Sequence, residues 1–120
     1  MVVRCFEEVL RVLRPGGLFG MCDPMHTGGP PPAAIREHVS EGPIPFERCL
    51  STPDAVADQF RSAGFEVLEA GYAPDARAWW SEFARYDAEC RENPDGNPRM
   101  LELDREGWVS VGFVIGRKPS

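Results

Sequence analysis

Two polar side chains, Asp23 and His26, follow the apolar run LFGMC, which occupies residues 18–22. A short run that is continuously apolar is typical of a strand buried on both faces. Ligands in open α/β sheets bind beyond the carboxyl ends of the parallel strands, so both residues are candidates for binding a substrate. Asp23 can orient a polar group or act as a base, and His26 can do likewise because its pKa lies near neutrality. The structural alternative is that Asp23 caps a turn before Pro24.

The preceding segment RVLRPGG, residues 11–17, contains paired glycines of the kind that phosphate-binding loops use. A phosphate loop needs a strand, then a glycine turn, then a helix whose first N–H groups face the anion. Here the order is reversed, because apolar residues at helical spacing precede the glycines over residues 2–13. The dipole at a helix C-terminus repels anions. We therefore expect a helix that ends before Pro15 and a glycine turn into the next strand.

A second helix is predicted over residues 53–63 by signals at both of its ends. Thr52 fits the N-cap, Pro53 fits the first helical position, and Asp54 complements the helix dipole. Gly64 suits the left-handed position that follows the last helical turn.

The other segments give two further strands and two weaker helices. Strand patterns cover FEVLEAGY (65–72) and WVSVGFVI (108–115), and helical patterns cover residues 33–41 and 76–90. A Pro- and Gly-rich loop is expected at 23–34, irregular structure at 41–49 and a turn at 93–98. Five charged residues are expected to form a solvated face: Arg85, Asp87, Glu89, Arg91 and Glu92.

The resulting order is helix, strand, helix, strand, insertion, strand, which is an α/β pattern with only part of a sheet. At 120 residues the chain is at most one domain. Its first helix has no visible cap, and its strands are too few for a complete sheet of this type. We therefore expect residues 1–120 to be part of a larger fold, with residues 74–106 as an insertion or lid.

The composition limits the possible function classes. The formal net charge is −6, and no cluster of Lys and Arg with interleaved aromatic residues occurs, which argues against nucleic-acid binding. No stretch approaches the ~20 apolar residues of a membrane span. Glu7 and Glu8 lie where a signal peptide would have its apolar run, so a cytoplasmic location is expected.

The four cysteines, Cys5, Cys22, Cys49 and Cys90, are widely spaced and form no C-x-x-C motif. This spacing favours reduced, mostly buried thiols over a disulfide framework or a zinc site. A metal site built from His26, His38 and Cys22 lacks any recognised ligand spacing, so no metal is predicted. His38 is expected to be a surface residue of its helix.

The segment EEVLRVLRPGGLFGMCDP, residues 7–24, resembles a signature of class I S-adenosylmethionine-dependent methyltransferases that spans the helix, turn and fifth strand. Residues 51–70 resemble the next helix and sixth strand of these enzymes. Residues 108–119 resemble their terminal strand, which runs antiparallel between the fifth and the sixth. Within the superfamily the chain is most similar to sterol 24-C-methyltransferases and related small-molecule C-methyltransferases. The resemblance covers nearly the whole chain, except residues 86–106.

The resemblance implies the C-terminal half of a Rossmann-like class I methyltransferase sheet. The family's cofactor-binding features, a G-x-G-x-G motif and an acidic residue ending the second strand, do not occur in these 120 residues. S-adenosylmethionine would then be bound mainly by an N-terminal half outside this sequence. As part of a complete methyltransferase, the segment would form the substrate side for a small, apolar acceptor of the sterol or prenyl type. The sequence does not decide whether residues 1–120 are active alone.

The same resemblance adds three candidate substrate-binding residues. Trp79 and Trp80 match an aromatic pair whose faces would stabilise the carbocation formed by methyl transfer to an alkene. We expect one of them to face the pocket and the other to pack; the alternative is that both anchor a lid helix to the core. Glu41 lies in a stretch similar to the family's substrate-proximal segment, although a solvated glutamate is the commoner case.

The competing function is a non-catalytic module that completes a sheet with another chain or dimerises. A half-sheet leaves one edge strand unpaired, and such an edge invites association. The partners expected are therefore a small-molecule substrate and either a complementary N-terminal half or a second copy of the chain. The sequence does not identify the methyl acceptor, nor does it separate C- from O- or N-methylation.

Overall fold

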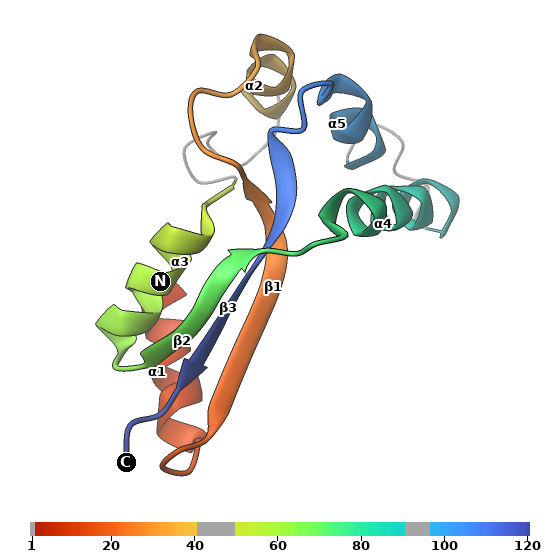
Figure 1. The fold of residues 1–120 in the computed structure, drawn as a ribbon. Helices are drawn as coiled ribbons and strands as arrows, with labels where there is room; N and C mark the ends of the chain where they lie inside the picture. The colour runs from red at the N-terminus through yellow and green to blue at the C-terminus, as the bar shows by residue number, and fades with distance from the viewer. Residues whose placement is uncertain (1, 41–49, 91–96) are drawn as a thin grey trace.

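The computed structural model describes residues 2–40, 50–90 and 97–120 of the chain. Within these ranges a three-stranded sheet forms the centre of an elongated molecule measuring 45 × 26 × 25 Å. Two helices cover one face of the sheet, and three more gather at one end of it (Figure 1). The molecule therefore has two distinct ends, which differ in how they are held together.

The sheet consists of β1 (Leu18–His26), β2 (Glu66–Tyr72) and β3 (Val109–Arg117). Its strand order is β1-β3-β2, and β3 runs antiparallel to both neighbours. The prediction that the last strand lies antiparallel between the two earlier strands is confirmed. Among the described residues β3 is paired along both edges, whereas β1 and β2 are each paired along one.

Helices α1 (Val2–Val12) and α3 (Pro53–Ala63) pack against each other and cover one face of the sheet. An aromatic cluster joins the two helices to the strands. The ring of Phe60 is fully buried, and its centroid lies 4.6 Å from that of Phe6 and 5.6 Å from that of Phe19. Such aromatic contacts bury large apolar surfaces, which makes this face the main core of the molecule.

The glycine turn after α1 has the structural role expected from the order of its elements. Gly16 adopts a left-handed conformation with φ of 80°, and its N–H donates to the Lys118 carbonyl at 2.8 Å. The Lys118 N–H donates to the Gly17 carbonyl at 2.9 Å, and its Nζ donates to the Leu13 carbonyl at 2.8 Å. The lysine thus satisfies a carbonyl at the C-terminal end of the helix.

Both predicted ends of α3 are confirmed. The Thr52 side chain accepts a hydrogen bond from the Ala55 N–H at 3.2 Å, which is the geometry of an N-cap. Gly64 has φ of 110°, and its N–H points at the Phe60 and Arg61 carbonyls. A Cβ at Gly64 would lie 2.9 Å from a terminal methyl of Leu10, which could move, so it is the positive φ that favours glycine here.

The other end of the molecule contains α2 (Ala33–Ser40), α4 (Ala76–Cys90) and α5 (Asn97–Leu103). These helices surround a second apolar core in which Trp80 and Trp108 are the largest side chains. The helix over residues 76–90 and the weak helix that begins at residue 33 were both predicted. The α5 helix was not, because residues 93–98 were expected to form a turn; residues 93–96 lie outside the described part.

A buried carboxylate ties this second core to the sheet. Asp104 is completely buried, and its two oxygens accept the Trp108 and Val109 N–H groups, both at 2.8 Å. Arg77 of α4 donates to the Asp104 side chain at 3.4 Å and to its carbonyl at 3.3 Å. Buried charged groups persist when such hydrogen bonds satisfy them, so this contact fixes where α4 lies against β3.

Strand β1 differs from its prediction in two respects. It extends to His26, so Asp23 and His26 belong to the strand and do not lie in a loop beyond it. It is also not buried on both faces, since Leu18 is 59 % exposed and Cys22 is exposed. The physical reason is that the described chain covers only one face of this strand and pairs only one of its edges.

Two further expectations about side-chain exposure are wrong. Asp87 was assigned to a solvated face, yet it is fully buried because it continues the α4 stripe that contains Trp80 and Ala84 at intervals of four and three residues. The thiols of Cys5, Cys22 and Cys90 are free but exposed, and not buried. Cys49, Arg91 and Glu92 lie outside the described residues.

Candidate functional site

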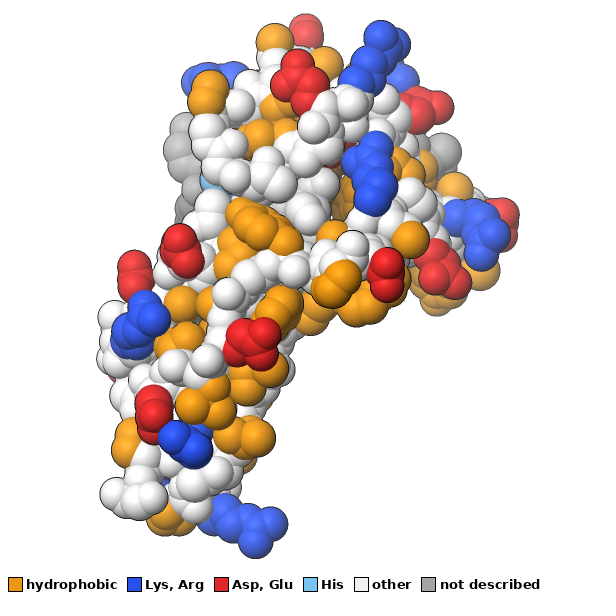
Figure 2. Space-filling model, viewed as in Figure 1, with side chains coloured by type: hydrophobic (Ala, Val, Ile, Leu, Met, Phe, Trp, Pro, Cys, Tyr) orange, Lys and Arg blue, Asp and Glu red, His pale blue; other side chains and the backbone are white. Residues whose placement is uncertain are grey.

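The face of the sheet opposite α1 and α3 carries the candidate site. Successive side chains of a strand point to opposite faces. In β3, Val114 packs into the core beneath α1 and α3, so its neighbours Phe113 and Ile115 emerge on the other face. Helix α4 projects over part of that face, and hydrophobic side chains gather along the hollow beneath it (Figure 2). The site is therefore formed by a sheet face and one overhanging helix.

Two adjoining recesses occupy this hollow. The first, here called the sheet recess, has a volume of about 450 Å³. Its lining is Gly20, Met21, Cys22, Ala73, Pro74, Trp79, Phe113 and Ile115. The second, here called the aspartate recess, has a volume of about 310 Å³. Its lining is Cys22, Asp23, Pro24, Trp79, Trp80, Phe83 and Val111. Because Cys22 and Trp79 belong to both linings, the recesses are continuous.

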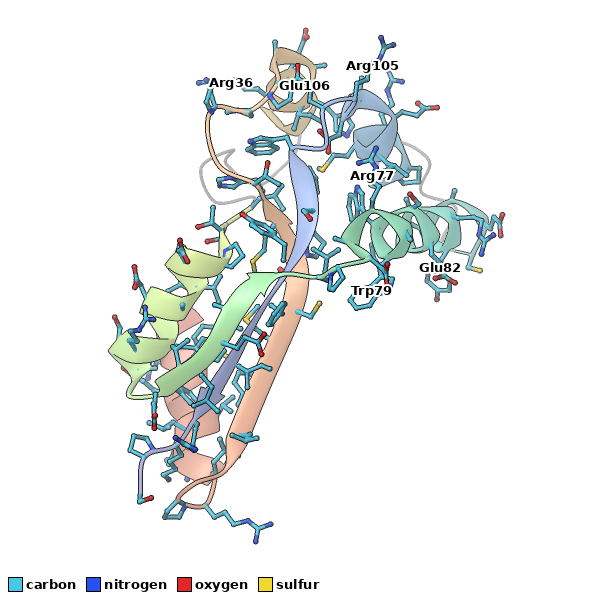
Figure 3. The ribbon with its side chains drawn as sticks, in the orientation of Figure 1. Arg36, Arg77, Trp79, Glu82, Arg105 and Glu106 are labelled. Carbon is cyan, nitrogen blue, oxygen red and sulfur yellow. The ribbon has the colours of Figure 1, made fainter. Side chains whose placement is uncertain are left out.

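The two tryptophans divide as expected into one exposed and one packed residue. Trp79 is 49 % exposed and points from the underside of α4 toward the sheet (Figure 3). Trp80 is only 2 % exposed and belongs to the second core, although part of its surface reaches the aspartate recess. Consecutive residues of a helix point about 100° apart, which accounts for this division.

Asp23 is the one charged residue in either lining. It pairs with Gly112 in the β1–β3 register, so these two positions lie on the same face of the sheet. Burial among the surrounding apolar groups raises the pKa of the Asp23 carboxyl above its ordinary value. Met25 and Val114 share this strand face and pack beneath α1 and α3, so the Asp23 side chain lies on that side of the sheet and not in the hollow beneath α4.

His26 is committed to contacts elsewhere in the fold and belongs to neither lining. Its ring stacks on Trp108 with centroids 4.7 Å apart, and its Nδ1 accepts the Gly28 N–H at 3.0 Å. Its backbone N–H donates to the Ser51 carbonyl, and its carbonyl accepts the Tyr72 hydroxyl at 2.8 Å. Burial lowers the pKa of the ring. The structure therefore does not bring His26 to the hollow beneath α4.

The remaining predicted residues add little to the site. Glu41 lies outside the described residues. His38 is half-buried on α2. In the described part of the chain, no three His, Cys, Asp or Glu side chains are placed to hold a metal ion. Over the same residues, no helix is long and apolar enough to cross a membrane.

Sequence reasoning missed most of the apolar lining. Phe83 follows Trp79 by four residues, so helical periodicity places it on the same side of α4. Phe113 and Ile115 share a strand face by simple alternation. These signals were present, but they identify a binding surface only once the uncovered face of the sheet is known.

Comparison with known proteins gives its information through structure alone. No protein-family profile matches the chain. No curated protein matches its sequence. Solved structures do match. A phosphoethanolamine N-methyltransferase 2 from Haemonchus contortus, complexed with phosphomonomethylethanolamine and S-adenosylhomocysteine, aligns over 98 % of this chain and 30 % of its own, with a TM-score of 0.69 and 16 % identity.

Two further solved structures match this chain with similar coverage and TM-scores. A putative sarcosine dimethylglycine methyltransferase from Galdieria sulphuraria aligns over 98 % of this chain and 47 % of its own, with a TM-score of 0.69 and 20 % identity. The [4+2]-cyclase SpnF aligns over 98 % of this chain and 44 % of its own, with a TM-score of 0.61 and 21 % identity. The chain therefore spans less than half the length of these structures.

These likenesses show that the chain has the fold of part of a small-molecule methyltransferase. The expected α/β half-sheet is thus confirmed at the level of fold. They do not single out the sterol methyltransferase group. One of the three proteins is a cyclase, which illustrates that this fold alone does not fix the reaction.

Proposed function

We propose that residues 1–120 form the substrate-side part of an S-adenosylmethionine-dependent methyltransferase that acts on a small apolar acceptor of the sterol or prenyl type. The observation that carries this proposal is the pair of continuous recesses, almost wholly apolar, on the uncovered face of a methyltransferase-like sheet. Mostly apolar concave sites with a few polar groups are the usual form of small-molecule binding sites.

The donor, in this proposal, is bound mainly by a part of the enzyme outside these residues. The chain matches only 30–47 % of the three solved structures described above. The Haemonchus enzyme has been solved with S-adenosylhomocysteine and with S-adenosylmethionine, so proteins of this fold hold the cofactor. Supplied from there, the cofactor would deliver a methyl group from its sulfonium; the residues described here would hold the acceptor.

Trp79 is assigned the main positioning role. An aromatic face stabilises positive charge, and methyl transfer to an alkene carbon leaves a carbocation on the acceptor. A rigid indole also restricts how the acceptor lies, which matters because the acceptor atom must be in line with the departing sulfur. Asp23 receives no role in this proposal, because its side chain lies on the sheet face that α1 and α3 cover. No residue is assigned as a general base.

The proposal is tested by methyl transfer from labelled S-adenosylmethionine to a panel of prenyl alcohols and sterols. The enzyme is the polypeptide that joins this segment to its donor-binding part. We expect Trp79→Ala to lower kcat/KM by ~10-fold or more, since both contact area and cation stabilisation are lost. Tyr86→Ala is the matched control, because Tyr86 is also an exposed aromatic of α4 but lies in neither lining. Equal rates for both variants, or no transfer to any apolar acceptor, would contradict the proposal.

A second candidate function, a module that completes a sheet with another chain, is supported by the outer edge of β1. The N–H of Thr27 donates to the Trp108 carbonyl, next to β3. The N–H of His26 donates to the Ser51 carbonyl, on the edge of β1 that faces away from β3. Because these directions alternate along an antiparallel strand, the even-numbered residues 18–22 direct their backbone groups away from β3. An open edge of this kind can accept a further strand. Sedimentation of the chain at increasing concentration distinguishes a self-associating module from a monomer.

A further inference from the structure

We propose that the outer edge of β1 pairs with a parallel strand, and that the segment of the polypeptide directly preceding α1 supplies this strand. The inference rests on the part of the proposed function that continues residues 1–120 into a donor-binding part. It deepens that function, because it identifies which element of the donor-binding part contacts this chain and where that element ends.

Two outer edges of the sheet are open among the described residues. Strand β3 is paired along both of its sides, so a further strand can join only beside β1 or beside β2. Unpaired N–H and C=O groups along such an edge form a template for another strand. Two independent features, the path of the chain and the protection of each edge, favour β1.

Helix α1 sets the direction of a strand that precedes it. The turn at residues 13–17 joins α1 directly to β1, so the helix runs antiparallel to β1 and begins toward the carboxyl end of that strand (Figure 1). A strand that a short loop connects to Val2 must therefore end near the carboxyl end of β1. The two strands are then parallel, and α1 is the crossover helix between them.

The sheet face that the helices cover decides which edge is used. Strands β1 and β2 both run antiparallel to β3, so they are parallel to each other, and the chain crosses between them through α3. Helix α1 lies on the same face as α3, with the Phe6 and Phe19 centroids 6.2 Å apart. Crossovers between parallel strands are almost always right-handed, and two such crossovers over one face move across the sheet in one direction. Because α3 leads from β1 toward β2, α1 reaches β1 from its outer side.

The two open edges also differ in how they are protected. Strand β2 carries Glu66 and Glu69, and a bulge between Val67 and Glu69 interrupts its register with β3. Charged residues and bulges are devices that keep an exposed edge from pairing. Residues 18–22 of β1 include no charged residue and no proline, and their register with β3 is unbroken. The β1 edge is therefore the one suited to a further strand.

The outer edge of β1 has room for a short strand only. Its even-numbered residues direct their backbone groups away from β3, so the Gly20 and Cys22 N–H groups face outward. Pro24 has no N–H to offer, and the His26 N–H already donates to the Ser51 carbonyl at 2.9 Å. The pairing therefore ends beside Pro24, which lines the aspartate recess together with Cys22. The carboxyl end of the added strand thus borders the hollow beneath α4.

Amide hydrogen exchange, measured by NMR on the polypeptide that joins this segment to its donor-binding part, tests the inference. The Gly20 and Cys22 amides should exchange at least ~100-fold more slowly than unpaired amides. The matched reference is the outer edge of β2, where the Ala70 and Tyr72 N–H groups point away from β3 because that of Ala73 donates toward it. These two amides should exchange rapidly. Nuclear Overhauser contacts from the Gly20 amide should reach residues within about 15 positions before α1.

A pair of substitutions at Gly20 sharpens the test. Gly20→Pro removes the outward N–H, whereas Gly20→Ala keeps it. We expect exchange at Cys22 to accelerate by at least ~10-fold in the proline variant and to stay unchanged in the alanine variant. Continued protection of the Phe60 amide in both variants shows that the fold is intact. Equal acceleration at Cys22 in the two variants would contradict the pairing.

The remaining outcomes separate the pairing from the proposed function. Rapid exchange at Gly20 and Cys22 in an enzyme that methylates an apolar acceptor would overturn the inference and leave the function standing. Slow exchange at these residues in a polypeptide that methylates no apolar acceptor would support the pairing and overturn the function. Protection of Ala70 and Tyr72 instead, or contacts from Gly20 to β1 of a second, differently labelled copy, would overturn the inference.

Discussion

The two ends of this molecule are stabilised in different ways. Beneath α1 and α3, an aromatic cluster around Phe60 is sealed between two helices and a sheet face. At the other end, α4 and α5 rest on a smaller core and are fixed to β3 through the hydrogen bonds of Asp104. The second arrangement holds α4 by one side only, so its other side keeps Trp79 and Phe83 exposed above the sheet. A helix held in this way is available to bind a ligand.

The largest expected loss of stability comes from a substitution in the core beneath α1 and α3. Phe60→Ala should lower the free energy of unfolding by about 3–5 kcal/mol, because the side chain is fully buried and leaves a cavity. Phe83→Ala, at an exposed position of α4, should change it by less than about 0.5 kcal/mol. Urea unfolding followed by circular dichroism measures both; Phe60→Leu provides a milder variant if Phe60→Ala does not fold. Similar losses at the two positions would remove the distinction between the ends.

A smaller effect is expected from loosening the second end. Asp104→Asn replaces one acceptor oxygen with a donor and leaves the Trp108 or the Val109 N–H unsatisfied, which should cost about 1–3 kcal/mol. Amide hydrogen exchange should accelerate at these two residues while Phe60 stays protected. Glu102→Gln, which removes an exposed partner of Arg99, is the control and should have almost no effect. Uniform acceleration across both ends would show that Asp104 does not act locally.

Protonation of His26 should weaken the second end more gently. Because burial lowers the folded-state pKa, the unfolded chain binds the proton more readily than the fold does. The stability from the neutral ring is present above about pH 6.5 and is lost as the pH falls below it. The urea midpoint should therefore decrease between pH 7.5 and pH 5. His26→Asn, which keeps an acceptor near the Gly28 N–H, should reduce this slope. A variant with the same slope as the parent would contradict the prediction.

The smallest effect concerns Asp23. Its folded-state pKa is raised by burial, so the fold favours the protonated form and loses stability as the pH rises through that pKa. Asp23→Asn should therefore slightly raise the urea midpoint at pH 7 and leave it unchanged near pH 3. A variant less stable than the parent at pH 7 would contradict this prediction.

Local sequence signals predicted the first end well. The caps of α3 and the glycine turn after α1 depend on residues adjacent in the chain, and the structure confirms them. The position of β3 followed from a resemblance of its whole segment to a family, and it is also confirmed. In each case the determining interactions join residues that are close in the sequence, or they belong to a recurring sheet topology.

The second end was predicted less well because its structure depends on tertiary contacts. The α5 helix has seven residues, and its Met100, Leu101 and Leu103 pack against the second core, so its own sequence carries little helical signal. Asp87 is buried because it lies on the side of α4 that packs into the second core. Its charge gives no sign of this burial in the sequence. Of the residues that line the hollow, the sequence singled out Trp79 and Trp80, whereas the lining from β3 required knowledge of the uncovered sheet face.

The central claim is that a small apolar acceptor binds in the hollow beneath α4 and not at the aromatic core. Two-dimensional ¹H–¹⁵N NMR of residues 1–120 during titration with farnesol tests it most directly. The account predicts that shifts concentrate at the Trp79 indole N–H and at the backbone of Cys22, Asp23 and Phe113, with Phe60 unaffected. Shifts centred on α1 and α3, or none at Trp79 at saturating farnesol, would contradict it.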